Sequence, residues 1–338
     1  MIEFHLLLIG YGNVARRFSS LLEERRHVLL RDHGLRTRTV GIATRRHGST
    51  LDGRAISRAS TRTFLRDAIR AHAAAAKQRR LIVIETTTLD IARGEPAIGH
   101  VRAAIAGGAH VITANKGPVA FAYGALARAA RRADRRFLFE GAVMDGVPIF
   151  NLVRETLPAV GLLGFRGVIN STTNFILTAM EEGQRFEDAL AEMQIRGVAE
   201  ADASLDVDGW DAAAKTAALA NVLLGANITP KDVVRQGIGV DTGRLAREAR
   251  AAGRRVKLVA RAERQGQRVM ARVAPEDLRG DDLLAGLEGQ QNALILKTEL
   301  LEEIAIVQRS GSLTQTAYAL LSDLIAISRG LAAGPGRR

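Results

Sequence analysis

The sequence predicts an α/β fold: a doubly wound parallel sheet, followed by an α+β domain. Three observations predict this class. The apolar run Phe4–Ile9 leads into a glycine-rich turn and a helix, segments typical of strands and helices then alternate as far as Glu140, and the part beyond that residue is rich in strands. The 338 residues, of which 47% are hydrophobic, are enough for two compact domains.

The composition excludes several classes of protein. The formal net charge is +12, but the basic residues are scattered as singles and pairs and only 4% of the residues are aromatic, so we expect no nucleic-acid partner. The absence of cysteine excludes disulfides, thiolate metal sites and a cysteine nucleophile. No apolar run approaches the ~18 residues of a membrane span. No targeting segment precedes the first strand, so we expect a cytoplasmic protein without a membrane partner.

The first strand, Phe4–Ile9, ends in a turn typical of dinucleotide-binding proteins. The turn reads G-x-G-x-x-A and precedes a predicted helix at 16–30. The first glycine allows a tight turn, the second lets the backbone approach a pyrophosphate, and free amides at the helix start face the phosphates. The sequence therefore predicts a Rossmann-type domain, the alternative being an ordinary strand–helix turn. The expected cofactor-binding residues are Gly10, Gly12, Asn13 and Val14.

The second strand, at 38–43, indicates which cofactor is preferred. An NAD-selective site usually has Asp or Glu at the end of this strand, where the carboxylate holds the ribose hydroxyls. Here the strand is followed by Thr44-Arg45-Arg46-His47, which contains no acid. Guanidinium groups suit a 2′-phosphate. Arg45 and Arg46 therefore predict a preference for NADP over NAD, unless they only form a solvated basic turn.

Further strands and helices complete the first domain. The predicted elements are a helix at 63–78, a strand at 80–85, a helix at 95–106, a strand at 110–113, a helix at 119–134 and a strand at 136–140. In such sheets ligands bind beyond the carboxyl ends of the strands. Thr87 and Lys116 follow two of these ends, so we add both to the expected cofactor site.

The regular alternation of strands and helices ends after Glu140, which predicts a second domain. Its predicted elements are a helix ending near 157, strands at 162–169, 255–261, 268–273, 292–297 and 303–308, and helices at 175–182, 211–224 and 243–252. The final helix, at 316–327, is expected to return to the nucleotide domain. The expected domains are thus 1–140 completed by 310–330, then 141–309, with a loose tail at 331–338.

The polar stretch Gly197–Lys215 holds five carboxylates and a lysine. Asp211 and Lys215 are four residues apart and share one face of a helix, either as a simple salt bridge or as an acid–base pair facing a substrate. A calcium loop is excluded, because Lys215 would occupy the position of its bidentate glutamate. Only six of the 48 basic residues are lysines. Because lysine, unlike arginine, can lose its proton, this bias points to Lys116 and Lys215.

These segments resemble homoserine dehydrogenase over nearly the whole chain. The matching stretches include GYGNVARRF, AGGAHVITANKGPVA, FEGAVMDGVPI, GVINSTTNFIL, GVAEADASLDVDGWDAAAK and TAYALLSDLIAI, in this order. The resemblance implies NAD(P)-dependent interconversion of L-homoserine and L-aspartate 4-semialdehyde, a step towards threonine, isoleucine and methionine. It also implies a homodimer whose second domain binds the substrate and forms the dimer.

The resemblance assigns roles to particular residues. Lys215 would be the proton donor and acceptor at the reacting oxygen, and Asp211 would orient the substrate and the lysine. Glu200 would bind the substrate ammonium group, and Asp206 would also contact the substrate. Lys116 would lie near both the nicotinamide and the substrate.

A monovalent-cation site is implied as well. Its ligands would be the side chain of Glu140 and the backbone carbonyls of Val143, Asp145 and Val147. Ligation by oxygen alone suits a hard cation such as Na⁺.

Two features depart from the family pattern. The loop Arg309–Thr316, which in the family closes over the nicotinamide, contains a single glycine, Gly311, which we assign to the cofactor site. The sequence also leaves no room for a C-terminal regulatory domain, so we expect no feedback inhibition by threonine.

Aspartate-semialdehyde dehydrogenase shares the cofactor fold but needs a cysteine nucleophile and is excluded. A non-catalytic NADP-binding or sensor protein remains the alternative.

Overall fold

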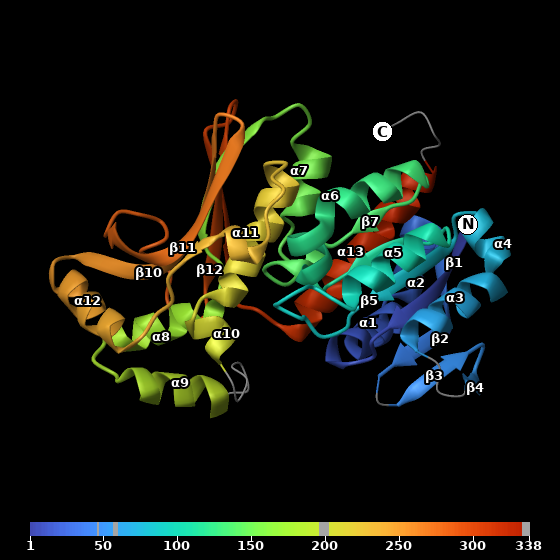
Figure 1. Ribbon diagram of the computed structural model, residues 1–338, viewed down its shortest axis with the longest axis horizontal. Helices are drawn as coiled ribbons and strands as arrows, with labels where there is room; N and C mark the ends of the chain where they lie inside the picture. Colours follow the sequence, from blue (N-terminus) through green and yellow to red (C-terminus); the bar gives the residue numbers. More distant parts are fainter. Residues whose placement is uncertain (46, 57–59, 196–202, 333–338) are drawn as a thin grey trace. The chain divides into compact units, whose positions relative to one another are not determined.

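The chain forms two compact units (Figure 1). The computed structural model describes all residues except 46, 57–59, 196–202 and 333–338. The first unit comprises residues 1–150 and 312–338, and the second comprises residues 151–311. The expected class, a doubly wound parallel sheet with a second sheet-containing domain, is confirmed. None of the helices in the described part of the chain has the length and apolar character needed to cross a membrane.

A seven-stranded sheet forms the centre of the first unit, and in the described residues its order is β4-β3-β2-β1-β5-β6-β7. The strands are β1 (Ile2–Ile9), β2 (Leu35–Thr44), β3 (Gly48–Leu51), β4 (Arg54–Ile56), β5 (Leu81–Glu85), β6 (His110–Thr113) and β7 (Phe137–Leu138). β1 pairs in parallel with both β2 and β5. The chain therefore reverses its direction of winding at β1, and ligands of such sheets bind at this switch point.

One edge of this sheet carries an antiparallel hairpin that was not predicted from the sequence. β3 and β4 form an antiparallel hairpin that extends the sheet beyond β2. β3 begins at Gly48, directly after the short turn that ends β2 at Thr44. A connection of this length can only join antiparallel strands, because a parallel crossover needs a dozen or more residues.

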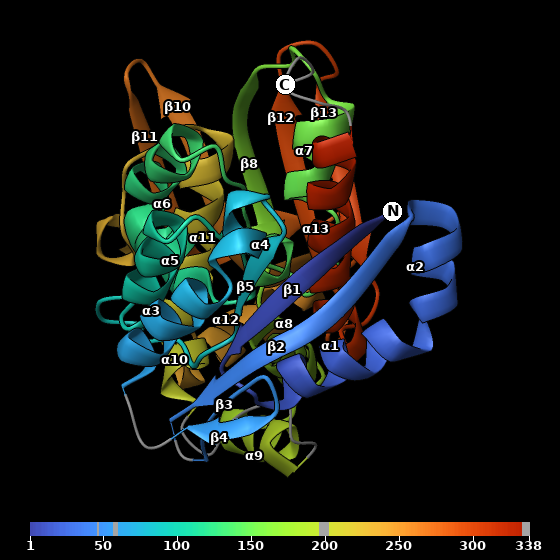
Figure 2. The ribbon, with the colours of Figure 1, turned by 90° about the vertical axis from the view of Figure 1, so that its right-hand side faces the viewer.

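Helices cover both faces of this sheet. They are α1 (Asn13–Glu24), α2 (Arg26–His33), α3 (Thr61–Ala71), α4 (Ala73–Lys77), α5 (Ala97–Ala106), α6 (Lys116–Arg132) and α13 (Leu313–Ala332). α1 and α13 pack on one face and α3 and α5 on the other (Figure 2). The final helix contributes the fully buried Leu320 and Leu324 to the core of the first unit, together with Phe4 and Phe18.

The single helix predicted at 16–30 is in fact two helices. Arg25 separates α1 from α2 with φ −100° and ψ 5°, outside helical values. α1 buries Phe18, Leu21 and Leu22, whereas α2 buries only Leu29. The charged residues between the two helices have no apolar side chains to pack on the core. Packing therefore does not stabilise a single straight helix through this segment.

The boundary between the units differs from the predicted one. Residues 141–150 belong to the first unit, not to the second, and residues 310 and 311 belong to the second. The reason lies in Glu140, whose carboxylate accepts hydrogen bonds from the amides of Ile149 at 2.6 Å and Phe150 at 2.9 Å. α13 also runs to Ala332, so the predicted tail at 331–338 begins too early.

The second unit contains a six-stranded sheet in the order β13-β12-β8-β10-β11-β9, as far as the described residues extend. Its strands are β8 (Leu162–Val168), β9 (Val234–Arg235), β10 (Arg254–Gln265), β11 (Arg268–Arg279), β12 (Asn292–Thr298) and β13 (Glu303–Gln308). Its helices are α7 (Phe150–Thr156, which begins at the boundary), α8 (Ser171–Glu181), α9 (Phe186–Ile195), α10 (Ser204–Val207), α11 (Trp210–Leu223) and α12 (Val240–Ala251). α8, α11 and α12 pack against β10.

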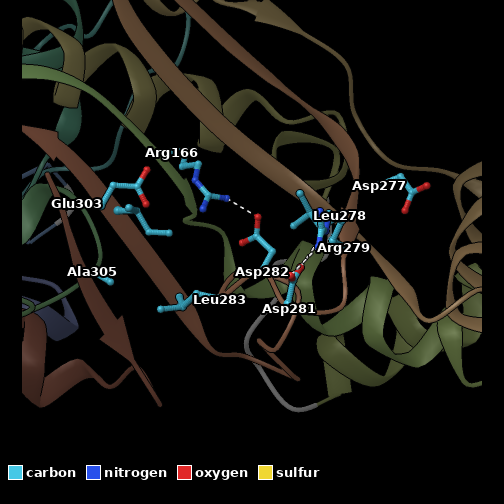
Figure 3. Close-up of a pocket in the computed structure, with 10 residues that line it drawn as sticks. Arg166, Asp277, Leu278, Arg279, Asp281, Asp282, Leu283, Glu303 and Ala305 are labelled. Carbon is cyan, nitrogen blue, oxygen red and sulfur yellow. Dashed lines mark hydrogen bonds and ion pairs between the residues drawn. The ribbon is translucent and has the colours of Figure 1, made fainter.

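A cavity of about 610 Å³ lies beside β8, β12 and β13 (Figure 3). Arg166 forms a 2.6 Å ion pair with Asp282 there, and Arg279 pairs with Asp281 at 2.8 Å. Small-molecule pockets are usually lined mainly by apolar side chains. The lining of this cavity is mostly charged and therefore unlike that of a usual small-molecule pocket. No predicted site residue contributes to the lining.

His110, the first residue of β6, is fully buried and neutral. Its Nδ1 accepts a hydrogen bond from the amide of Arg136 at 2.9 Å, and its Nε2 lies 3.1 Å from the carbonyl oxygen of Arg79. The proton therefore sits on Nε2. Burial, with the nearby charges of Arg135 and Arg79, lowers the pKa of His110 to about 3.

Acidification is therefore expected to reduce stability through His110. The unfolded histidine binds a proton below its ordinary pKa of 6.5, whereas the folded one stays neutral down to about pH 3. The stabilisation is fully present above pH 6.5 and decreases as the pH falls through this window, by about 2–3 kcal/mol at a pH two units below the unfolded pKa. The amide of His110→Gln can make both hydrogen bonds without titrating, so this variant should not show the loss. The free energy of unfolding in urea should therefore fall by this amount more in the wild type than in His110→Gln over the same pH range. Parallel pH dependences would contradict the prediction.

Candidate active site

The carboxyl ends of β1 and β5 meet at Gly10, the first glycine of the predicted cofactor turn. Gly10 has φ +86°, and a Cβ atom there would lie 2.7 Å from the carbonyl oxygen of Thr86. Thr86 is held in place, because its amide donates to Ile9 at 2.8 Å and its hydroxyl donates to the Gly10 carbonyl at 3.1 Å. The close approach of the two strands thus requires glycine.

The next residues of this turn leave room for a ligand. Apart from the backbone next to it in the chain, no atom of the described residues lies within 4 Å of the Cβ position of Gly12. Gly12 is the N-cap of α1, and no side chain makes a capping hydrogen bond there. Asn13 is exposed and Val14 half-buried in the first turn of the helix. Amides at such a helix start suit a phosphate group.

A buried carboxylate organises the loops at the ends of β5 and β6. Glu85, fully buried, accepts a hydrogen bond from the amide of Thr87 at 3.1 Å and another from the Thr87 hydroxyl. Its other oxygen accepts from the Thr113 hydroxyl at 2.9 Å, and Thr113 in turn accepts from the amide of Asn115 at 2.9 Å. One side chain therefore fixes Thr87, a predicted cofactor residue, relative to the loop that carries Lys116.

Asn115 places Lys116 at the start of α6. Its side-chain oxygen caps the helix by accepting from the amide of Gly117 at 2.8 Å, and its side-chain nitrogen donates to the carbonyl of Thr87 at 2.9 Å. Lys116 is therefore the first helical residue, half-buried at the carboxyl edge of the sheet. Glu85 and Asn115 are not among the site residues predicted from the sequence.

The turn after β2 is fixed by Thr44. Its hydroxyl donates to the carbonyl of Gly48 at 3.0 Å and accepts from the amide of His47 at 2.8 Å. Arg45 is exposed on this turn. Arg46 lies outside the described residues.

The turn predicted to hold a cation contains one buried carboxylate, that of Glu140, and a tight bend, and it lies against a second buried carboxylate on α13. Glu140 is 2% exposed, and its amide donates to the fully buried Asp323 of α13 at 2.9 Å. Met144 and Asp145 both adopt positive φ, 51° and 53°. Asp145 also accepts a hydrogen bond from the Thr316 hydroxyl at 3.1 Å. Carboxylate charge and backbone oxygens in a tight turn are a donor set that fits a hard cation.

In the second unit, α11 carries the pair singled out in the sequence. Asp211 and Lys215 form an ion pair of 2.9 Å, and each side chain is 17% exposed. The Lys215 ammonium also donates to the carbonyl oxygen of Ile169, just beyond the end of β8, at 2.9 Å. The simple salt bridge considered above does form, but it is mostly buried and its lysine is fixed by a second contact.

Asn170, which is not among the predicted site residues, joins this pair to Asp206. Its side-chain nitrogen donates to Asp206 at 2.7 Å and to Asp211 at 3.0 Å. Asn170 is the N-cap of α8. A polar N-cap residue directly after a buried strand was the available sequence signal, because such positions concentrate hydrogen-bonding groups.

The structure brings three predicted residues of the second unit together: Asp206, Asp211 and Lys215. Glu200 lies outside the described residues. Gly311 is exposed at the end of the second unit, and the neighbouring Ser312 caps the first turn of α13 through the amide of Gln315 at 3.2 Å. The predicted cofactor residues Gly10, Thr87 and Lys116 all belong to the first unit.

Comparisons with known proteins find relatives for both units of the chain. The family "Homoserine dehydrogenase, NAD binding domain" matches residues 10–140, and the family "Homoserine dehydrogenase" matches residues 148–325. The chain is 34% identical over 345 residues to the NAD(+)-dependent homoserine dehydrogenase of Pseudomonas canavaninivorans, with 97% of each chain covered. It is 37% identical over 324 residues to the homoserine dehydrogenase of Sulfurisphaera tokodaii, with 96% of this chain and 98% of that one covered.

A solved structure shows the same fold. The crystal structure of a homoserine dehydrogenase from Thiobacillus denitrificans matches with a TM-score of 0.82 and 31% identity, over 99% of this chain and 75% of that one. The chain therefore belongs to the homoserine dehydrogenase family, whose enzymes are NAD(P)-dependent oxidoreductases that act on a CH–OH group.

Proposed function

We propose that this protein interconverts L-homoserine and L-aspartate 4-semialdehyde with NADP as its preferred cofactor and Lys215 as the proton donor and acceptor. This reaction is a step towards threonine, isoleucine and methionine. The observation that carries the proposal is the mostly buried pair of Asp211 and Lys215, 2.9 Å apart, in a chain of this family. A buried lysine with a fixed direction is suited to proton transfer.

In the oxidation of homoserine, one carbon loses a hydride and its hydroxyl loses a proton. The bound nicotinamide supplies the acceptor for the hydride. Lys215 in its neutral form takes the proton from the hydroxyl oxygen, and the resulting ammonium is stabilised by Asp211 at 2.9 Å. In the reverse direction the Lys215 ammonium returns the proton to the carbonyl oxygen. Asp211 thus favours the charged lysine, and the carbonyl of Ile169 fixes its direction.

Charged groups would hold the rest of the substrate. Homoserine carries an ammonium and a carboxylate group, and each is best bound by the opposite charge. We assign the ammonium to Glu200 and Asp206, and we place Lys116 close to both nicotinamide and substrate. The role of Glu200 rests on the resemblance alone.

The turn around Glu140 would hold a monovalent cation such as Na⁺. Its ligands would be the Glu140 carboxylate and the carbonyls of Val143, Asp145 and Val147. Support comes from the burial of Glu140 beside Asp323, since a cation would offset the charge of these two carboxylates.

NADP preference is supported by Arg45, which is exposed on the turn after β2, and by the absence of any acid between Thr44 and Gly48. Changing Arg45 and Arg46 to glutamine should raise KM for NADP about 10–100-fold, the worth of one or two charge-assisted hydrogen bonds. KM for NAD should change less than about twofold. Steady-state kinetics with both cofactors measure the ratio, with Arg54→Gln, another exposed arginine of this hairpin, as control. An equal effect on both cofactors would refute the preference.

The direct test of the function is reduction of NADP by L-homoserine at alkaline pH, followed by absorbance of the reduced nicotinamide. Turnover that requires both homoserine and cofactor is the expected result. A non-catalytic NADP-binding or sensor protein is the rival function, favoured by the single glycine in the loop Arg309–Thr316. Tight NADP binding without turnover would support that rival.

We further propose a homodimer that forms through the second unit and acts in the cytoplasm. The resemblance supports this assembly. The face of the second sheet that carries Ala305 of the charged cavity also carries Val307, which is 47% exposed. The charged cavity in Figure 3 and this exposed strand would then face the second subunit.

A further inference from the structure

We propose that Asn170 is a positioning residue for this reaction: its side-chain amide holds Asp206 and Asp211 together and thereby fixes the lysine that transfers the proton. This role rests on the proposed function, because it concerns proton transfer at Lys215. Asn170 is 4% exposed and lies directly between the end of β8 and the start of α8.

Both hydrogens of the Asn170 amide group are used on carboxylates. The nitrogen lies 2.7 Å from an Asp206 oxygen and 3.0 Å from an Asp211 oxygen. An amide NH₂ group has two donors, so these two contacts use its full donor capacity. α10 and α11, which carry the two aspartates, are therefore tied to one point.

The opposite end of the amide fixes its orientation. The Asn170 oxygen accepts hydrogen bonds from the amide of Thr173 at 2.8 Å and from the Thr173 hydroxyl at 3.0 Å. Thr173 is fully buried. The oxygen thus caps α8, which leaves the nitrogen directed at the aspartates. A flipped amide would set its oxygen against two carboxylates and its nitrogen against the helix amides.

Two adjacent residues each contact one member of the ion pair between Asp211 and Lys215. Ile169 accepts from the Lys215 ammonium through its backbone carbonyl at 2.9 Å, and Asn170 donates to Asp211 through its side chain. The end of β8 is packed into the core, since Val168 and the next residue, Ile169, are 0% and 1% exposed. The distance and direction of Lys215 are therefore set from the sheet and not only from its own helix.

The charges explain why this position needs an amide. Two carboxylate oxygens bound to one nitrogen lie within about 6 Å of each other, a separation at which like charges disfavour ionisation. The amide donates to both without adding charge. A third carboxylate would increase the repulsion, and a lysine or arginine would compete with Lys215 for Asp211. Asparagine is therefore a residue that can hold both aspartates beside one cation without adding a charge of its own.

Asn170→Asp is the sharpest test, because it is nearly isosteric. The new side chain still caps α8 with one oxygen but offers no donor to the aspartates when ionised. We expect kcat to fall about 100-fold near neutral pH, the size expected for a displaced catalytic group, with little change in KM for NADP. Protonation of the new acid restores one donor, so the ratio of wild-type to variant kcat should grow as the pH rises. A purely structural role would not produce this pH dependence.

Asn221→Ala provides the matched control. Asn221 is also 4% exposed, lies further along α11, and exchanges two hydrogen bonds with the backbone of Ile228 at 2.9 and 3.0 Å. It should lose comparable stability but keep kcat within about twofold. Circular dichroism and melting temperature show whether each variant is folded.

The outcomes separate the two proposals. If the wild type does not oxidise homoserine, the proposed function is wrong. If the wild type is active and folded Asn170→Asp keeps wild-type kcat and an unchanged pH profile, the role of Asn170 is refuted while the function stands. Should Asn170→Asp not fold, Asn170→Ser, which can still cap the helix, replaces it, with the same loss of kcat expected and wild-type kcat again refuting the role.

Discussion

Lys215→Ala is expected to lower kcat for homoserine oxidation by about 10²–10⁴-fold, the contribution typical of a general acid–base group. The ammonium is fixed 2.9 Å from both Asp211 and the carbonyl of Ile169, so no neighbouring side chain of α11 can take its place by a small movement. The residues that precede it, Ala212–Ala214, are buried and apolar. KM for NADP should stay nearly constant, because the proton acceptor and the cofactor turn belong to different units.

Chemical rescue distinguishes loss of the proton acceptor from general damage. A small primary amine added to Lys215→Ala should restore part of the activity, since it can enter the vacated space and accept the proton. Lys231→Ala, which removes an exposed lysine of the same unit, should leave kcat unchanged. A folded Lys215→Ala protein with wild-type turnover would overturn the catalytic assignment.

Gly10→Ala should damage both folding and cofactor binding. The added methyl group would meet the Thr86 carbonyl oxygen at 2.7 Å, and φ at this position is +86°. Because hydrogen bonds to Ile9 and Gly10 hold Thr86, the strain is not relieved by a side-chain rotation. We expect a loss of about 2–4 kcal/mol in the free energy of unfolding, from overpacking and a disfavoured backbone.

Gly12→Ala is the matched comparison for Gly10→Ala. It has open space around the added methyl and an ordinary φ of −83°. It should cost no more than about 1 kcal/mol of stability, the penalty of alanine at an N-cap, but weaken NADP binding at least about tenfold, because the methyl occupies the space that the pyrophosphate approaches. Urea unfolding and titration of cofactor fluorescence measure the two effects separately. Equal stability of the two variants would contradict the strand-contact argument, and unchanged NADP affinity of Gly12→Ala would contradict the assigned cofactor turn.

The sequence predicted the first unit well where apolar runs and glycines carry the signal. β6 was predicted with its observed bounds, and β1 and β5 with small shifts at their ends. Most residues of these strands are buried. A strand that is buried on both faces has a nearly continuous run of apolar residues, which can be recognised in the sequence. The ion pair of Asp211 and Lys215 could also be predicted from the sequence, because residues four apart on a helix lie on the same face.

The remaining features depend on contacts between distant segments. The hairpin of β3 and β4 was missed because its strands are short and half-exposed, so they show no apolar alternation. Glu85 and Thr113 are 28 residues apart, and Asn170 and Asp211 are 41 apart. No periodicity links such residues. Only the fold, by bringing strand ends together, turns an unremarkable asparagine into the centre of a hydrogen-bond network.

The burial of α13 in the first unit has a consequence for synthesis. During translation, residues 1–150 emerge with the apolar face of α1 uncovered, since Leu320 and Leu324 are not yet made. The buried Asp323, which accepts from the Glu140 amide, is missing at that stage as well. The second unit, which lies between the two segments in the chain, can therefore complete its own core first. The nucleotide-binding unit becomes whole only after the last helix has left the ribosome.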